Sequence, residues 1–274
     1  MGALLGSLTA LGIGGSDMFG RRVTAATSPV TASAVMQLFA ALLSLLAITF
    51  VSSEWIWRDV WVGAVSGLGM GSGLACYFGG LQRSSSAVVA PIVATLSAVI
   101  PYLYTLARGT SPTALALLGA IAALLGLLLV TVSGTSRERV RAGLVWGLAS
   151  GLSYGFALTV VIETTSDSGV WPSVSQRLVA VVLMIGLAGS LNVPKVPPVG
   201  LRLAAVLAGF FAGATSLSYI AGVQIDAQPT VVTAGLFPVA SVAGGRVFYG
   251  DEVTASQVLG IAVALGGVTA IVLA

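Results

Sequence analysis

Ten apolar stretches, each about as long as a bilayer is thick, constrain this chain more than any other feature. A helix needs about 20 predominantly apolar residues to cross the hydrocarbon layer. The 274 residues divide into ten such stretches with short polar breaks between them. We therefore predict ten transmembrane helices, near residues 2–20, 30–51, 60–81, 86–107, 113–133, 142–162, 172–191, 200–221, 228–248 and 254–273.

The composition leaves little surface for water. Hydrophobic residues make up 57% of the chain and charged residues 8%, against about 25% charged in a soluble domain. The Lys and Arg residues are scattered singly, so nucleic acid is not an expected partner. The amino-terminal stretch has no basic residues before it and is predicted to be a spanning helix, not a cleaved signal peptide. The expected fold class is an all-α integral membrane protein, with the lipid bilayer as its surroundings.

The residue types that are missing exclude several function classes. The chain has no histidine, and Cys76 is its only cysteine. Disulfide frameworks, most zinc sites and Ser-His or Cys-His catalysis are therefore not expected. No phosphate-binding loop of the G-x-x-x-x-G-K-[ST] type occurs, which argues against ATP hydrolysis. We expect no metal, no cofactor and no enzymatic activity.

The chain contains an internal repeat with an offset of 141 residues. Residues 109–133 fall on residues 250–274 with eight identities, and the same offset aligns glycines of the first and sixth spans. The predicted units are residues 1–134 and 140–274. Because five spans is an odd number, the second unit must enter the membrane in the opposite sense. Inverted repeats of this kind in transporters place the substrate between the two units, near the bilayer midplane.

The basic residues are distributed unequally between the two sides of this topology. Arg58, Arg108 and Arg177 fall on one side, and nine others fall on the opposite side. The positive-inside rule then puts both chain ends outside the cytoplasm. The membrane that the chain crosses is expected to be the cell (cytoplasmic) membrane. The nine are Arg21, Arg22, Arg83, Arg137, Arg139, Arg141, Lys195, Arg202 and Arg246.

Motifs in the second half support a family resemblance. They are a proline within the ninth span, an acidic pair before the last span and glycines along it: Phe237-Pro238, Gly250-Asp251-Glu252, and Gly260 with Gly266-Gly267. This layout resembles the EamA-like ten-helix branch of the drug/metabolite transporter superfamily. The first half departs from it at Ser97, which aligns with Pro238. The resemblance implies a secondary carrier or exchanger of small metabolites, such as amino acids, nucleoside derivatives, sugars or drugs.

Polar and ring-bearing side chains near the middle of the spans are candidates for the substrate pathway. Serine and threonine hydroxyls have an alternative, since they also bond the backbone of their own helix. A phenol at that depth needs a partner, and small-molecule pockets combine aromatic walls with a few polar groups. The candidates are Tyr77, Thr95, Ser153, Tyr154, Ser218, Tyr219 and Thr233.

Asp17 and three prolines each allow two interpretations. Asp17 forms an ion pair with Arg21 one turn away at the membrane surface, or it is a proton-coupling carboxylate, as an acid inside a membrane is a functional candidate. Pro91, Pro101 and Pro238 fall inside predicted spans and remove backbone hydrogen bonds there. The resulting kinks are either architectural or the bending points of a gate.

Two helix starts are also predicted from capping patterns. Ser111 before Pro112 is typical of an N-cap followed by an N1 proline, and Thr254 with Gln257 has the spacing of a capping box. Asp251 and Glu252 are expected to stabilise the positive end of the last helix.

Three functions remain open on the sequence. The leading hypothesis is a secondary active transporter, an exporter or exchanger of a small molecule, driven by a proton gradient or a counter-substrate. The alternative is a flippase-like or accessory protein that handles a lipid-linked substrate. An intramembrane enzyme would need a paired nucleophile and base, which these residues do not provide.

Overall fold

The computed structural model describes residues 1–109, 111, 113–133 and 136–274, and the side chains of all of these except 223, 224, 227 and 228. Its described residues form helices and connecting segments without a strand. Two short 3-10 helices, η1 (Ser166–Ser168) and η2 (Val199–Leu201), lie in connections. The long helices are α1 (Gly2–Ala26), α2 (Pro29–Ala47), α3 (Trp57–Arg83), α4 (Ser86–Ala107), α5 (Ala114–Val132), α6 (Arg137–Val161), α7 (Trp171–Ser190), α8 (Arg202–Ala234), α9 (Phe237–Tyr249) and α10 (Ala255–Leu273).

The length and composition of these helices confirm a multi-pass membrane protein. Among the described residues, nine helical segments are long and apolar enough to cross a membrane. The tenth, α1, has 25 residues, and its glycines, serines and Asp17 make it less apolar than the others. The predicted all-α fold with ten spans is therefore confirmed.

Two helix boundaries differ from the prediction in ways that matter for function. Helix α1 continues to Ala26, six residues beyond the predicted end of the first span, so Asp17 lies well inside it. Helix α8 includes the predicted break before Pro229, but Asp226 has extended backbone angles (φ −162°, ψ 95°), so the chain kinks there. The eighth and ninth spans therefore meet at a kink instead of a loop.

Pro238 lies inside a membrane span, Pro229–Tyr249, as predicted, but the prediction that it removes a helical hydrogen bond there is wrong. The ninth span is interrupted at Gly235-Leu236, and Pro238 occupies the first turn of α9. A proline there removes no intrahelical hydrogen bond, because the first amides of a helix have no partner in it. Pro91 and Pro101 do lie inside α4, as predicted.

The two predicted helix starts have different outcomes. Pro112 and residue 134, the predicted end of the first unit, lie outside the described residues. The N-cap of α5 is Thr113, not Ser111, and the Thr113 hydroxyl accepts a hydrogen bond from the Ala116 amide at 3.1 Å. The capping box of α10 is confirmed by hydrogen bonds in both directions between Thr254 and Gln257, at 3.0 and 3.1 Å.

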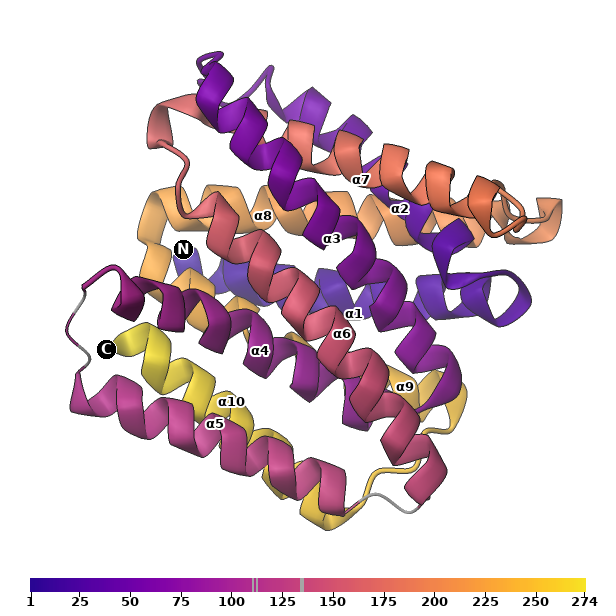
Figure 1. Cartoon of the computed structure of the whole chain (residues 1–274), viewed down its shortest axis with the longest axis vertical. Coiled ribbons are helices and arrows are strands. Elements are labelled where there is room, and N and C mark those ends of the chain that lie inside the picture. Colours follow the sequence, from indigo (N-terminus) through magenta and orange to yellow (C-terminus); the bar gives the residue numbers. More distant parts are fainter. Residues whose placement is uncertain (110, 112, 134–135) are drawn as a thin grey trace.

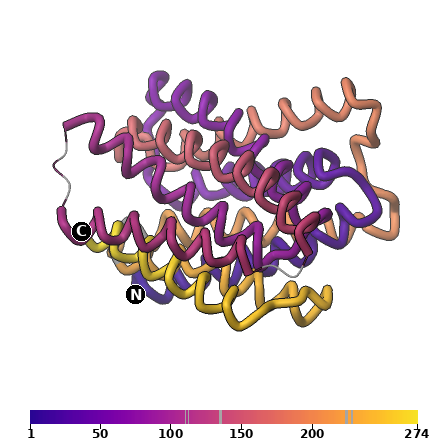
Figure 2. Tube along the Cα trace, turned by 60° about the horizontal axis from the view of Figure 1, so that its bottom comes forward, coloured from indigo at the N-terminus to yellow at the C-terminus, as the bar shows by residue number. Residues whose placement is uncertain are grey.

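The helices of the two predicted units pack mainly on each other. Figure 1 shows α5 beside α10 along one edge of the molecule and α2 with α7 along the opposite edge. Figure 2 shows α5 and α10 side by side again from another direction. Between these edges, α1 packs on α8 and α9, while α6 packs on α3 and α4. If each helix of α1–α5 is exchanged with the helix five places later, the pairings of α1 become those of α6 and the reverse. Two repeats related by a two-fold axis require this correspondence.

The glycines of α5 and α10 meet in the same symmetric way. A Cβ atom added to Gly119 would lie 2.7 Å from the carbonyl oxygen of Gly267, and one added to Gly126 would lie 2.6 Å from that of Gly260. The offset of 141 residues converts the first contact into the second. Small residues allow this backbone approach in lipid, where apolar side chains gain little by leaving the bilayer.

A ladder of glycines also joins α6 to α4. Glycines four residues apart on α6 receive the branched side chains of α4, as ridges entering a groove. The pairs are Gly147 with Ile92, Gly151 with Leu96 and Gly155 with Ile100. The spacing therefore serves helix packing, and it holds α6 in a fixed register along α4.

Aromatic side chains mark the end of the molecule at which α3 and α7 begin. The Trp55 ring packs edge-on against Trp57 and Trp171, with centroids 5.0 and 4.5 Å apart. Tryptophan favours the interface between bilayer and water. We call this the Trp end, and the other end, where α1, α3 and α9 finish, the basic end.

Candidate functional site

A buried carboxyl group lies at the meeting point of the two units. Asp17 of α1 is 3% exposed, and its Oδ2 accepts hydrogen bonds from Tyr77 Oη of α3, at 2.7 Å, and from the Ser241 hydroxyl of α9. Nine residues separate Asp17 from the end of α1, which is about 13 Å at 1.5 Å per residue. We call these three side chains the Asp17 cluster; it joins helices of both predicted units.

The structure contradicts the predicted ion pair between Asp17 and Arg21. Arg21 makes a bidentate pair with Asp251, with nitrogen–oxygen distances of 2.7 and 2.8 Å. Asp17 makes no salt bridge within 4.0 Å in the described part of the chain. Its carboxyl is therefore held by hydroxyl donors, and the second interpretation, a functional acid, remains.

Asp251 also has a different role from the one predicted. Its Oδ2 accepts hydrogen bonds from the amide and the hydroxyl of Ser86, at 3.0 and 2.8 Å, so it caps the positive end of α4, not of α10. Burial raises the pKa of Asp251, but the Arg21 guanidinium and Ser86 outweigh it and hold this pKa below its usual range. One carboxylate thus ties α1, α4 and the α9–α10 connection together.

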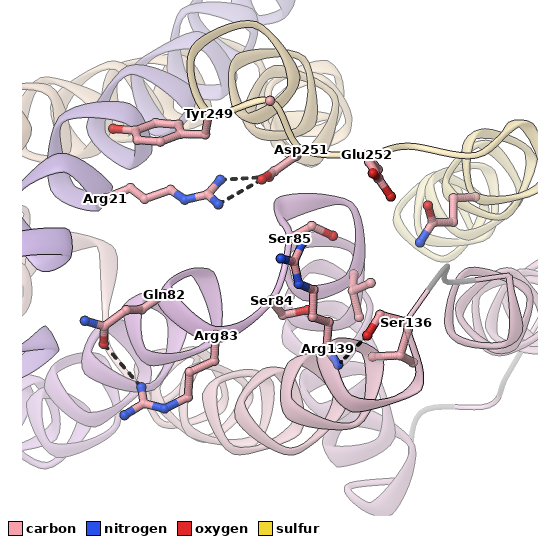
Figure 3. A pocket seen from close by; sticks show the side chains of 14 residues that line it. Arg21, Gln82, Arg83, Ser84, Ser85, Ser136, Arg139, Tyr249, Asp251 and Glu252 are labelled. Atoms are coloured by element: carbon pink, nitrogen blue, oxygen red, sulfur yellow. Dashed lines mark hydrogen bonds and ion pairs between the residues drawn. The ribbon is translucent and has the colours of Figure 1, made fainter.

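The Arg21–Asp251 pair borders a cavity of about 270 Å³ at the basic end. Figure 3 shows the two side chains facing each other on one side of the cavity, with Ser84, Ser85 and Arg139 on the other. The Arg21 guanidinium stacks on the Tyr249 ring, with Cζ 4.4 Å from the ring centroid. The Tyr249 hydroxyl donates a hydrogen bond to the Met18 carbonyl at 2.5 Å. We call this cavity the vestibule; Asp17 lies one helical turn deeper than Arg21 along α1.

A second polar cluster surrounds Arg177, which the sequence analysis counted with the basic residues on one side of the membrane. Arg177 lies six residues after the start of α7, about 9 Å along the helix. Its guanidinium donates to Gln37 Oε1 of α2 at 2.7 Å and to the Ser216 hydroxyl of α8 at 2.8 Å. We call these side chains the Arg177 cluster; like the Asp17 cluster, it joins both units.

Tyr154 of α6 lies between the two clusters. It interacts electrostatically with both the Asp17 carboxyl and the Arg177 guanidinium. Its ring packs against the core group that contains Tyr77 and Phe78. Of the predicted pathway residues, Tyr77 and Tyr154 are therefore brought together with Asp17.

The other predicted pathway residues lie elsewhere or bond to backbone. Ser153 donates to the Ala149 carbonyl of its own helix, and Thr233 donates to the Pro229 carbonyl and to Ala3 of α1. Thr95 is fully buried, and its hydroxyl has no partner among the described residues. Ser218 is partly buried and Tyr219 is 37% exposed on α8. Within the described residues, no hydrogen bond or ion pair joins these five to Asp17 or Arg177, and their part in a pathway stays a prediction.

Long apolar helices that pack around a buried carboxyl and a buried guanidinium define a multi-pass membrane protein. Residues 1–132 match the EamA-like transporter family, which is consistent with membership of the drug/metabolite transporter superfamily. A solved structure, described only as the crystal structure of a protein, is similar to this chain with a TM-score of 0.65 and 18% identity, over 98% of this chain and 95% of that chain. That likeness supports the fold alone. No curated protein matches the chain.

Proposed function

We propose that the protein is a proton-coupled secondary transporter of a small metabolite, an exporter or exchanger in the cytoplasmic membrane. The observation that carries the proposal is the Asp17 cluster. An acid inside a membrane is costly to keep charged and is found where protons or substrates pass. Asp17 is held by one hydroxyl from each predicted unit, so a relative movement of the units changes its partners.

The charge distribution supports a cytoplasmic location of the basic end. Because Arg177 lies inside the membrane, Arg58 and Arg108 are the two basic residues counted toward the Trp end. Nine basic residues are counted toward the basic end. Positive residues are retained on the cytoplasmic side. The vestibule then opens to the cytoplasm, and the Arg21–Asp251 pair lies between the cytoplasm and Asp17.

Alternating access supplies the mechanism. With the units rocked one way, the Asp17 cluster communicates with the vestibule; rocked the other way, it communicates with the Trp end. Proton binding to Asp17 removes a buried negative charge and so favours one arrangement over the other. The gradient that drives the cycle is then the proton gradient across the membrane.

Flux in reconstituted vesicles tests the proposal. A thermal-shift screen of the full chain over amino acids, nucleosides and amphipathic cations selects a ligand, and its uptake is then measured with and without an imposed pH gradient. We expect saturable uptake that the gradient accelerates, loss of that acceleration in Asp17→Asn, and normal behaviour in the control Asp167→Asn, which removes an exposed carboxylate.

Two outcomes contradict the proposal in different ways. Uptake that never saturates for any selected ligand contradicts a carrier. Gradient-driven uptake that is unchanged in Asp17→Asn contradicts the role of Asp17 and leaves carrier activity in place.

A further inference from the structure

Resting on the proposed transport function, we infer that the Arg177 cluster binds the carboxylate of the substrate, so that the protein takes small organic acids in preference to neutral or cationic compounds of the same shape. In the sequence, Arg177 counted only toward the distribution of basic residues between the two sides of the membrane. The proton coupling proposed for Asp17 does not involve it.

The first step is the position of Arg177. It is the only charged residue in α7, a helix of 20 residues. A guanidinium at this depth carries a large desolvation cost. A residue with that cost is expected to face a polar interior surface, and the partners of Arg177 on α2 and α8 show that it does.

The second step is its incomplete set of partners. A guanidinium has five N–H donors. Gln37 and Ser216 accept two of them, both partners are neutral, and the buried Nε has no hydrogen-bond partner in the described part of the chain. No carboxylate lies within 4.0 Å of Arg177 among the described residues. The site therefore keeps a full positive charge and free donors in a place where both are costly.

The third step is the geometry that Gln37 and Ser216 impose. Gln37 is fully buried, and its amide nitrogen donates to the Met70 carbonyl at 3.3 Å, which fixes its oxygen toward Arg177. Two fixed acceptors orient the planar guanidinium. A planar fork of N–H donors matches a carboxylate in a bidentate arrangement better than it matches any neutral group.

The test compares ligands that differ only in charge. Thermal shifts of the purified full chain in detergent are measured against benzoate, benzamide and phenyl phosphate, for the wild type, Arg177→Gln, Arg177→Lys and the control Arg58→Gln, which removes an exposed cation toward the Trp end. We expect benzoate to stabilise the wild type and the control, with benzamide at least tenfold weaker. Arg177→Gln should lose the preference, and Arg177→Lys should retain part of it, because lysine keeps the charge without the fork.

A further variant keeps the test decisive if Arg177→Gln does not fold. Gln37→Glu places a carboxylate at the 2.7 Å contact with the guanidinium. This internal anion should raise the melting temperature of the ligand-free protein and abolish the response to benzoate.

The outcomes separate the inference from the transport proposal. Equal responses to benzoate and benzamide, or an unchanged benzoate response in Arg177→Gln or Gln37→Glu, overturn the inference. A stronger response to phenyl phosphate than to benzoate assigns the site to phosphate esters and overturns the carboxylate assignment. Carboxylate binding through Arg177 without any saturable flux contradicts transport and leaves the inference standing.

Discussion

Replacing Asp251 by asparagine should open the basic end of the protein. The carboxylate accepts two hydrogen bonds from Arg21 and two from Ser86, and the side chains of the ion pair are only 13% and 6% exposed, so solvent screens them weakly. A hydrogen bond to a charged group contributes about 1.5–3 kcal/mol. Because asparagine keeps one acceptor oxygen, we expect a net loss of roughly 3 kcal/mol in the state that the pair holds together.

That loss corresponds to a change of roughly 100-fold in the ratio of closed to open molecules, at 1.4 kcal/mol for each factor of ten. The chain carries its own reporter, since Cys76 is its only cysteine, is partly buried beside Tyr77 and interacts with Tyr154. We expect a polar maleimide added at the basic end of oriented vesicles to reach Cys76 from that side, because Cys76 lies seven residues before the end of α3 there.

We expect Asp251→Asn to accelerate alkylation of Cys76 by about 10- to 100-fold. The control Glu54→Gln, an exposed carboxylate at the Trp end, should change the rate by less than about fivefold. The melting temperature, measured in parallel, separates opening from unfolding. A rate within fivefold of the wild type in a folded Asp251→Asn protein would refute the reasoning.

Three further results are expected. Gly126→Ala should lower the melting temperature by the equivalent of about 1–3 kcal/mol, because its Cβ would lie 2.6 Å from the Gly260 carbonyl oxygen, whereas Gly186→Ala, with no atom within 4 Å, should leave it unchanged or raise it; equal effects would contradict the glycine contacts. Thr254→Ala should cost about 1 kcal/mol in thermal unfolding through loss of the capping box, and no change would show that the cap contributes nothing. Asp251 has a pKa below its usual range, so its stabilisation is complete above the unfolded-state pKa of about 4 and is lost as the pH falls through the lowered pKa. The difference in melting temperature between the wild type and Asp251→Asn should therefore be constant from about pH 5 to 8 and shrink below about pH 4, and a difference that already shrinks near pH 6 would contradict the ion pair.

Hydropathy predicted the helices well because each apolar stretch must fill the same bilayer thickness. Hydropathy failed to predict helix boundaries where a helix continues into charged residues or breaks within an apolar stretch. Helix α1 runs on through Arg21 and Arg22 to Ala26, since a helix end at the membrane surface tolerates charge. The ninth span looked continuous, but Gly235-Leu236 interrupts it, and only backbone geometry reveals that break.

The candidate site was predicted only in part, because its contacts join residues far apart in the sequence. Asp17 and Tyr77 were each identified from their own spans, yet their hydrogen bond links positions 60 residues apart, and Ser241 lies 224 residues from Asp17. Arg177 fell near the start of a predicted span and was only counted with the basic residues of that side. Its isolation within an apolar helix was the available signal.

The seam between α5 and α10 has a mechanical consequence. Where Gly119 meets Gly267 and Gly126 meets Gly260, backbone rests on backbone, and there are no rotamers to rearrange. Such a contact should resist sliding of α5 along α10 and allow a small rotation between them. We therefore expect this pair to act as the hinge, with larger displacements at the opposite edge, where α2 and α7 carry Gln37 and Arg177.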